Sequence, residues 1–272
     1  MIGPLHVTNG DIVADALAAT SLPGRTLVWA DVLHAGPLEA EPARSRKARA
    51  AFLARHGWGE AASLEARFER RDARLDEARW DGLPIVLWFE HDLFDQLLLL
   101  QLLTALSGAQ PGQVELIQAA THLGSLEPSE LEALWPTRQP VAAGTLAEAA
   151  AIWDAVCAGE LEAASGVRCD ALPYVEPALE RLREERLEPS RTKRQLLAAF
   201  AAGQATASAA YVASQAEEDA AFLGDAWAFV AIEELVDDGL VEPTDGAAPP
   251  ACDTETFASR IFTLTSRGLA RV

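Results

Sequence analysis

Short apolar runs alternate with longer amphipathic segments along the first 143 residues. The apolar runs predict strands at 5–8, 25–29, 84–89 and 114–118, and leave room for a fifth near 140–143. Helical periodicity predicts helices near 11–20, 42–56, 60–79 and 93–106 between them. The run at 84–89 is continuously apolar, which is typical of a strand buried on both faces. This alternation predicts an α/β fold, a small Rossmann-like parallel sheet in which the helical pair 42–79 is an insertion.

The pattern changes towards the C-terminus. Residues 144–189 are rich in Ala and Glu and predict an α-helical connector. After residue 190 we expect helices at 191–202, 206–214 and 218–238, then strands at 240–242 and 260–264, which is the order of a winged helix. The expected domains are therefore a Rossmann-like α/β domain at 1–143, a helical connector at 144–189 and a winged-helix-like domain at 190–272. The Pro- and Gly-rich loop at 243–252 is the expected site of internal proteolysis.

Composition favours a folded, cytoplasmic protein. Half of the 272 residues are hydrophobic, and the mean hydropathy is +0.06. No apolar run approaches the roughly 18 residues of a membrane span, and the first residues lack the basic segment of a signal peptide. The three cysteines, Cys157, Cys169 and Cys252, are widely spaced and form no C-x-x-C pair.

The net charge of −19 opposes binding to nucleic acid or to an anionic membrane. Residues 41–80 nevertheless hold ten of the 22 Lys and Arg residues, which predicts a salt-bridged helical face or a docking patch for an acidic partner. The expected third helix of the C-terminal domain begins among Glu217, Glu218 and Asp219, and these acids would face DNA phosphates. We therefore expect no DNA binding, and a protein partner or a homo-oligomer stays open.

Polar residues gather where three of the predicted strands end. The ligand crevice of an open parallel sheet lies outside the carboxyl ends of its strands, so we expect these residues to form one polar site. They are His6, Asn9, Gly10 and Asp11 after the first strand, Asp31 and His34 after the second, and Glu90, His91, Asp92, Asp95 and Gln96 after the third.

Each of these residues also has a structural interpretation. Asp11 and Asp92 stand where helix N-caps belong, and the spacing of Asp92 and Asp95 is that of a capping box. His6 alternates with apolar neighbours and could be a hydrogen-bonded histidine of the sheet. His34 and His91 are the candidates for general acid–base catalysis, with Asp95 as a third catalytic residue.

No common motif names a cofactor. The chain lacks G-x-G-x-x-G, the P-loop, H-E-x-x-H and G-x-S-x-G, so the cofactor stays unknown. A divalent metal stays open, because His34, His91, Asp11, Asp92 and Asp95 offer the nitrogen and oxygen donors that suit zinc, manganese or iron. Their spacing does not name an ion.

Three blocks in order, LHVTNGD, LVWADVLHAGP and LWFEHDLFDQL, resemble the bacterial family named domain of unknown function 1835, over roughly residues 3–140. The blocks LPYVEPALERL, SRTKRQLL and FLGDAW resemble the C-terminal part of its longer members. The resemblance implies no activity. It implies the following family-motif positions: His6, Asn9, Gly10, Asp11, Asp31, His34, Gly36, Pro37, His91, Asp92, Asp95 and Gln96.

Two functions follow from the sequence. In the first, the α/β domain binds a small polar molecule and the C-terminal unit relays its occupancy or contacts a protein. In the second, the protein is an enzyme with His/Asp acid–base chemistry, and a bound metal would direct it towards hydrolysis or group transfer. Simple binding is slightly favoured, because no nucleophile stands out.

Overall fold

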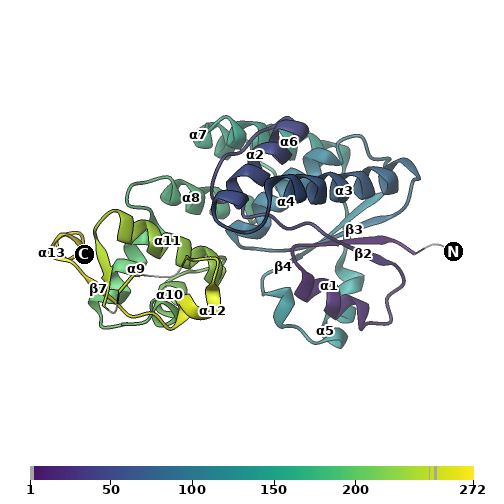
Figure 1. Ribbon diagram of the computed structural model, residues 1–272. Coiled ribbons are helices and arrows are strands. Elements are labelled where there is room, and N and C mark those ends of the chain that lie inside the picture. Colours follow the sequence, from purple (N-terminus) through teal and green to yellow (C-terminus); the bar gives the residue numbers. More distant parts are fainter. Residues whose placement is uncertain (1–2, 245, 248–249) are drawn as a thin grey trace. The chain divides into compact units, whose positions relative to one another are not determined.

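The computed structural model describes residues 3–244, 246–247 and 250–272, and the chain divides into two compact units (Figure 1). The first unit comprises residues 1–51 and 61–180, and the second comprises 52–60 and 181–272. Both units are therefore built from two separate stretches of chain.

The first unit is built on one five-stranded sheet. Its strands are β1 (Leu5–Thr8), β2 (Arg25–Val28), β3 (Ile85–Glu90), β4 (Val114–Ala119) and β5 (Gln139–Pro140), in the order β2-β1-β3-β4-β5. The first four strands are parallel, and β5 runs antiparallel to β4. The chain leaves β1 towards β2 and then returns to the other side of β1 to form β3. The boundary between β1 and β3 is therefore the point where the strand order reverses, and ligands of open α/β sheets bind at such a point.

Helices cover both faces of this sheet (Figure 1). One face carries α1 (Asp11–Ala18) and α5 (Pro128–Leu134), and the other carries α3 (Ala61–Trp80), α4 (Leu93–Ala105) and α6 (Ala143–Cys157). All six residues of β3 are buried, which confirms the strand predicted from its continuous apolar run. Successive side chains of a strand point to opposite faces, and on the α1 face Val86 and Trp88 join Val13, Leu17 and Ile117 in the core.

The segment 144–189, expected as a connector, belongs mostly to the first unit. Helix α6 packs against α4, and α7 (Leu161–Gly166) packs against α6. The buried side chains of α6 include Leu146, Ile152 and Trp153. Of this segment, residues 181–189, which begin in the last turns of α8 (Val175–Glu185), belong to the second unit.

The second unit is mainly helical. It contains α9 (Arg191–Ala201), α10 (Ala207–Gln215), α11 (Asp225–Asp237), β6 (Val241–Pro243), α12 (Thr254–Ala258), β7 (Phe262–Leu264) and α13 (Ser266–Leu269), and β6 pairs antiparallel with β7. Its core includes the stacked rings of Phe229, Phe257 and Phe262. Helix α12 was missed by the sequence prediction. Of the predicted loop 243–252, residues 245, 248 and 249 lie outside the described residues.

The third predicted helix of this unit began too early, at residue 218. Helix α11 begins at Asp225, with Gly224 as its N-cap. The preceding Glu218 is drawn into ion pairs with Arg181 and Arg191, and its side chain is only 2% exposed. One of the three acids that were expected to face DNA phosphates is thus neutralised inside the second unit.

Residues 52–60 join the second unit through aromatic contacts. They form the end of α2 (Pro42–Arg55) and the turn before α3. The rings of Phe52, His56 and Trp58 lie 5.1–5.4 Å from the ring of Trp227 in α11. Within the described part of the chain, no helix combines the length and hydropathy that a membrane span requires.

Candidate functional site

Glu90 is the centre of a polar cluster at the carboxyl ends of β1 and β3. It is the last residue of β3, and its side chain is buried. Its Oε2 lies 2.7 Å from Nδ1 of His122, while its Oε1 accepts hydrogen bonds from the backbone N–H of Leu123 (2.8 Å) and from Nδ2 of Asn9 (3.3 Å). The loop after β1 and the loop after β4 are thus both tied to one carboxylate at the end of β3.

A second carboxylate, that of Asp95, contacts the backbone of Glu90. It is fully buried in the first turn of α4. Its Oδ1 accepts from Nδ2 of Asn9 at 2.7 Å, and its Oδ2 accepts from the backbone N–H of Glu90 at 2.5 Å. The amide of Asn9 therefore bridges Asp95 and Glu90, and this bridge fixes both carboxylates. Gln96 also contacts this strand end, because its Nε2 donates to the carbonyl of Glu90.

Asp92 has a structural role and also faces the cluster. It is the N-cap of α4, and its Oδ1 accepts from the backbone N–H of Asp95 at 3.0 Å. The expected capping box is only half formed, since the side chain of Asp95 turns to Asn9 and Glu90 instead. The other oxygen of Asp92, Oδ2, lies 3.9 Å from Nδ1 of His122. Capping uses one oxygen and leaves the second for the site.

The surroundings of the cluster disfavour the ionised forms of Asp92 and Asp95. Burial, with repulsion from Glu90, raises the pKa of Asp92 to about 7. Burial and the neighbouring charges of Asp92 and Glu90 raise the pKa of Asp95 well above its usual value. The ion-pair partner of Glu90 and Asp92 is His122, which is charged only when protonated and whose side chain is half exposed.

These residues could hold a metal ion. Glu90, Asp92 and His122 each offer one ligand atom, and the three atoms lie within 4.8 Å of one another. Two carboxylate oxygens and one imidazole nitrogen suit zinc, manganese or iron. His122 was not predicted, although it stands three residues after β4 and so follows a fourth strand end.

His91 borders the cluster. Its ring centroid lies 6.4 Å from that of His122 and 5.8 Å from that of Tyr174. Its Nδ1 is buried, and no residue that the structure describes hydrogen-bonds to it.

Gly10, which follows β1, has a structural role. It is the N-cap of α1, and its carbonyl accepts a hydrogen bond from the hydroxyl of Thr8.

The other predicted residues have different surroundings. Asp11 was expected as an N-cap, but it is exposed in the first turn of α1, one residue after the observed N-cap, Gly10. Asp31 forms a buried ion pair with Arg49 at 2.7 Å. His34 is buried, and its ring lies 6.3 Å from that of Phe94. The structure thus brings four of the predicted residues together with Glu90 and His122, namely Asn9, Asp92, Asp95 and Gln96. The expected grouping of Asp11 and Asp31 with them is not found among the described contacts, because Asp31 pairs with Arg49 and Asp11 is exposed.

His6 is a hydrogen-bonded histidine of the sheet. Its Nδ1 accepts from the indole N–H of Trp88 at 3.1 Å, and its Nε2 lies 3.1 Å from the carbonyl oxygen of Pro23. Because an indole N–H can only donate, Nδ1 carries no proton and the proton resides on Nε2. The ring is therefore neutral, and both of its nitrogens are used within the fold.

No family model matches the chain, and comparison with curated proteins gives no match either. The resemblance to the family named domain of unknown function 1835 therefore stays a prediction.

Proposed function

We propose that the first unit binds a divalent cation at Glu90, Asp92 and His122, and that a small polar ligand completes the coordination of this cation. The observation that supports the proposal most is the meeting of two buried carboxylates and a half-exposed imidazole where the strand order reverses. A ligand reaching the exposed edge of His122 would meet both carboxylates.

A cation would relieve the electrostatic cost of this cluster. Buried carboxylates are stable when they are paired or coordinate a metal. Here Glu90, Asp92 and Asp95 are buried side by side, and the pKa values of the two aspartates are raised. Asn9, which Asp95 holds in place, would orient the carboxylate of Glu90, because hydrogen bonds from residues outside the coordination shell orient the groups that coordinate a metal.

Three protein donors leave coordination positions for a ligand. Zinc sites with three protein ligands keep a fourth position for water or substrate. The unpartnered Nδ1 of His91 would supply a hydrogen bond near that position. The same nitrogen favours the enzymatic alternative, in which a metal-bound water attacks a substrate and His91 transfers a proton.

We further propose that the first unit is Rossmann-like and a member of the family named above, and that the second unit is a winged-helix-like module for protein contact. Helix α11, in the place of a recognition helix, contains Asp225, Glu233, Glu234 and Asp237 but no Lys or Arg. Such a helix would repel DNA phosphates.

Equilibrium dialysis tests the metal site. The purified full-length protein is dialysed against Mn²⁺ or Zn²⁺, and bound metal is measured by elemental analysis. We expect about one equivalent of one of these ions to be retained, in line with one three-donor site. His122→Ala should lose it, and Asp81→Asn, which removes an exposed carboxylate at the end of α3, should retain it. Absence of bound metal, or equal retention by His122→Ala, would refute the proposal.

An activity assay distinguishes simple binding from the enzymatic alternative. The metal-loaded protein is incubated with p-nitrophenyl acetate or with p-nitrophenyl phosphate. If the protein hydrolyses either ester, and His91→Ala loses that activity while it keeps the metal, the enzymatic alternative replaces simple binding.

A further inference from the structure

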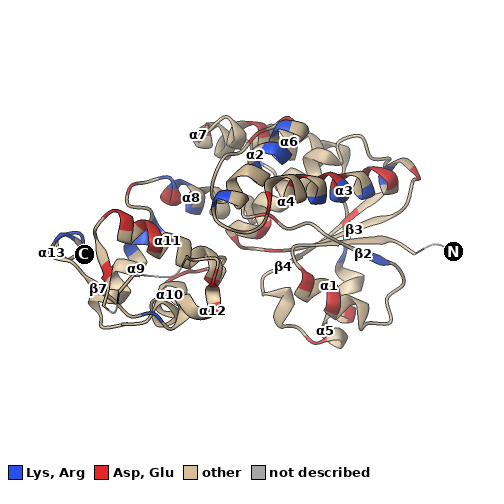
Figure 2. Ribbon diagram, viewed as in Figure 1, with Lys and Arg blue, Asp and Glu red and all other residues tan. Residues whose placement is uncertain are grey.

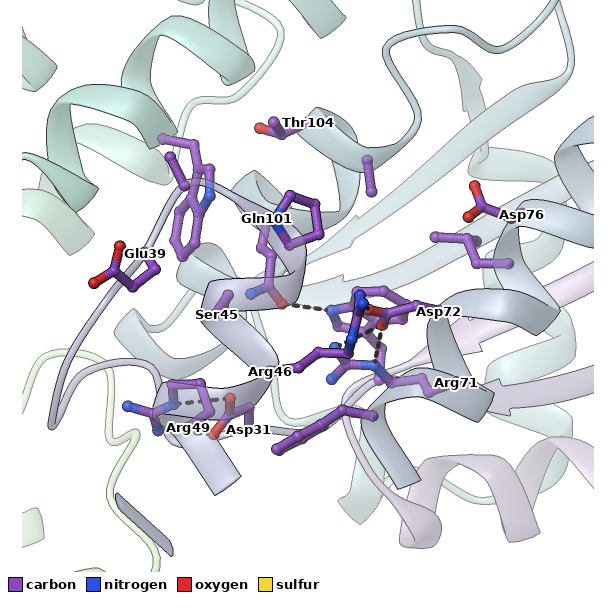
Figure 3. A pocket seen from close by; sticks show the side chains of 17 residues that line it. Asp31, Glu39, Ser45, Arg46, Arg49, Arg71, Asp72, Asp76, Gln101 and Thr104 are labelled. Carbon is purple, nitrogen blue, oxygen red and sulfur yellow. Dashed lines mark hydrogen bonds and ion pairs between the residues drawn. The ribbon is translucent and has the colours of Figure 1, made fainter. Parts of the chain in front are cut away.

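The first unit contains a cavity of about 300 Å³ that the Glu90 cluster does not line (Figure 3). Side chains of α2, α3, α4 and α6 line it, together with residues that follow β2. Its walls carry three aromatic residues and three arginines: Trp29, Phe68, Trp153, Arg46, Arg49 and Arg71.

Arg49 is fully engaged in the fold. Its Nε and Nη2 donate to the two oxygens of Asp31 at 2.9 and 2.7 Å. It also donates to the backbone carbonyls of Val32, Ala35 and Pro37. Both charged side chains are only 2% exposed, so this pair anchors α2 to the loop after β2 and is not available to a ligand.

Arg46 and Arg71 share a single carboxylate. Oδ1 of Asp72 accepts from Nε and Nη2 of Arg71 at 3.0 and 2.9 Å, and Oδ2 accepts from Nη1 of Arg46 at 3.1 Å (Figure 3). One negative charge thus faces two positive charges. Nη1 of Arg71 is buried, and no described residue accepts a hydrogen bond from it. Burial lowers the pKa of Arg71, as expected for a guanidinium that is incompletely compensated.

Aromatic side chains hold this guanidinium in place. Its central carbon lies 3.6 Å from the ring centroid of Trp29 and 4.9 Å from that of Phe68. The indole N–H of Trp29 donates to Oε1 of Gln101 at 2.9 Å, which fixes the ring in turn. The planar donor group is therefore set before any ligand arrives.

The other acids of the cavity do not cancel the excess charge. Figure 3 shows Glu39 and Asp76 on opposite sides of the view, away from the group formed by Arg46, Asp72 and Arg71. Asp76 pairs with Arg79, and more than half of its side chain is exposed to solvent, where its charge is screened.

We propose that this cavity binds a small organic oxyanion. A carboxylate or phosphate group accepts hydrogen bonds from Arg46 and Arg71, and the apolar body of the molecule packs against the aromatic wall. The oxyanion supplies the second negative charge that the pair of arginines lacks, and charge-assisted hydrogen bonds of this kind are among the strongest in proteins. This site does not depend on the proposed metal site at Glu90.

Isothermal titration of the full-length protein with benzoate and with inorganic phosphate tests this proposal. Benzoate represents planar carboxylates, and phosphate represents phosphoryl groups. We expect saturable binding of at least one probe, and a dissociation constant about tenfold or more higher in Arg46→Gln, because a hydrogen bond between charged groups is lost. The probe that binds more tightly shows whether the cavity prefers a carboxylate or a phosphoryl group.

Arg70→Gln is the matched control, because Arg70 is the exposed neighbour of Arg71 on α3 and does not line the cavity. Arg70→Gln and His122→Ala should bind the probe as the native protein does. Arg46→Gln is the deciding variant, since the side chain of Arg46 is 23% exposed and its loss should leave the fold intact, as checked by circular dichroism. Absence of saturable binding, unchanged affinity in Arg46→Gln, or an equal loss in Arg70→Gln would overturn the proposal.

Discussion

The buried side chain of His6 links the stability of the fold to pH. Its neutral ring accepts a hydrogen bond from Trp88 through Nδ1, and protonation there would break that bond. Burial lowers the pKa of His6 below its usual value of 6.5. The folded protein therefore resists a proton that the unfolded chain accepts.

We predict that this histidine destabilises the fold in mild acid. With a lowered pKa in the folded state, its contribution is fully present above pH 6.5, the pKa in the unfolded chain, and is lost as the pH falls below that value. Urea midpoints of the native protein and of His6→Gln should be compared at pH 7.5 and 5.0. The native protein should lose more stability than the variant, and equal losses would exclude His6 as the cause.

At the same scale, sequence reasoning could find some site residues but not others. Asn9, Asp92 and Asp95 follow strands whose apolar runs are plain, so their neighbourhood could be inferred from parallel pairing. His122 could not be assigned, because it lies in a loop three residues after β4, where the sequence has no periodicity or motif that marks a site. Asp31 was expected to face the crevice, yet its partner Arg49 lies on a helix whose docking no spacing rule reveals.

At the scale of elements, hydrophobic periodicity predicted the first unit well. β1, β3, β4 and α4 lie within one or two residues of their predicted bounds. The signal is plainest for β3, which begins with five apolar residues, and for α4, which is rich in leucine. Figure 2 shows acidic and basic residues interleaved along α3, and the pair Arg46–Asp72 joins α2 to α3, as expected for a salt-bridged face. The start of α11 was misplaced, because Glu218 follows helical periodicity but is held by Arg181.

The true start of α11 makes a direct prediction about substitution. Ala220→Gly lies before the helix and should change the free energy of unfolding by only a few tenths of a kcal/mol. Ala228→Gly lies inside α11, where Ala228 is fully buried, and should cost about 1–2 kcal/mol from lost helix propensity and a lost buried methyl group. Chemical denaturation measures both values. Similar costs for the two variants would place residue 220 inside the helix.

At the scale of the whole molecule, the two units are interleaved in sequence. The turn at 52–60 is assigned to the second unit, where Trp58 packs on Trp227 with their ring centroids 5.3 Å apart. No sequence pattern predicted this, because about 170 residues separate the two tryptophans and each occurs in a segment that looks independent. The residues assigned to a connector likewise proved to pack on the sheet domain through α6.

This assignment predicts a long-range effect of Trp58→Ala. Removing the ring should speed hydrogen exchange of backbone amides in α11, since an aromatic pair contributes about 0.5–1.5 kcal/mol beyond its buried area. Amides of β3 should exchange at the native rate. Trp80→Ala, which removes an indole that is 77% exposed, is the control and should leave α11 unchanged. Exchange that rises in β3 but not in α11 would contradict the assignment of residues 52–60.

The central claim is that Glu90, Asp92 and His122 form a cation site, and thermal unfolding of Asp92→Asn tests it most directly. Asparagine caps a helix about as well as aspartate, so the variant keeps the cap of α4 and removes one of the repelling charges. Without metal, we expect it to melt at or above the native temperature. With excess Mn²⁺ or Zn²⁺, the native protein should gain several degrees and the variant should gain little. A native protein that responds to neither ion, or a variant that gains as much as the native protein, would contradict the account.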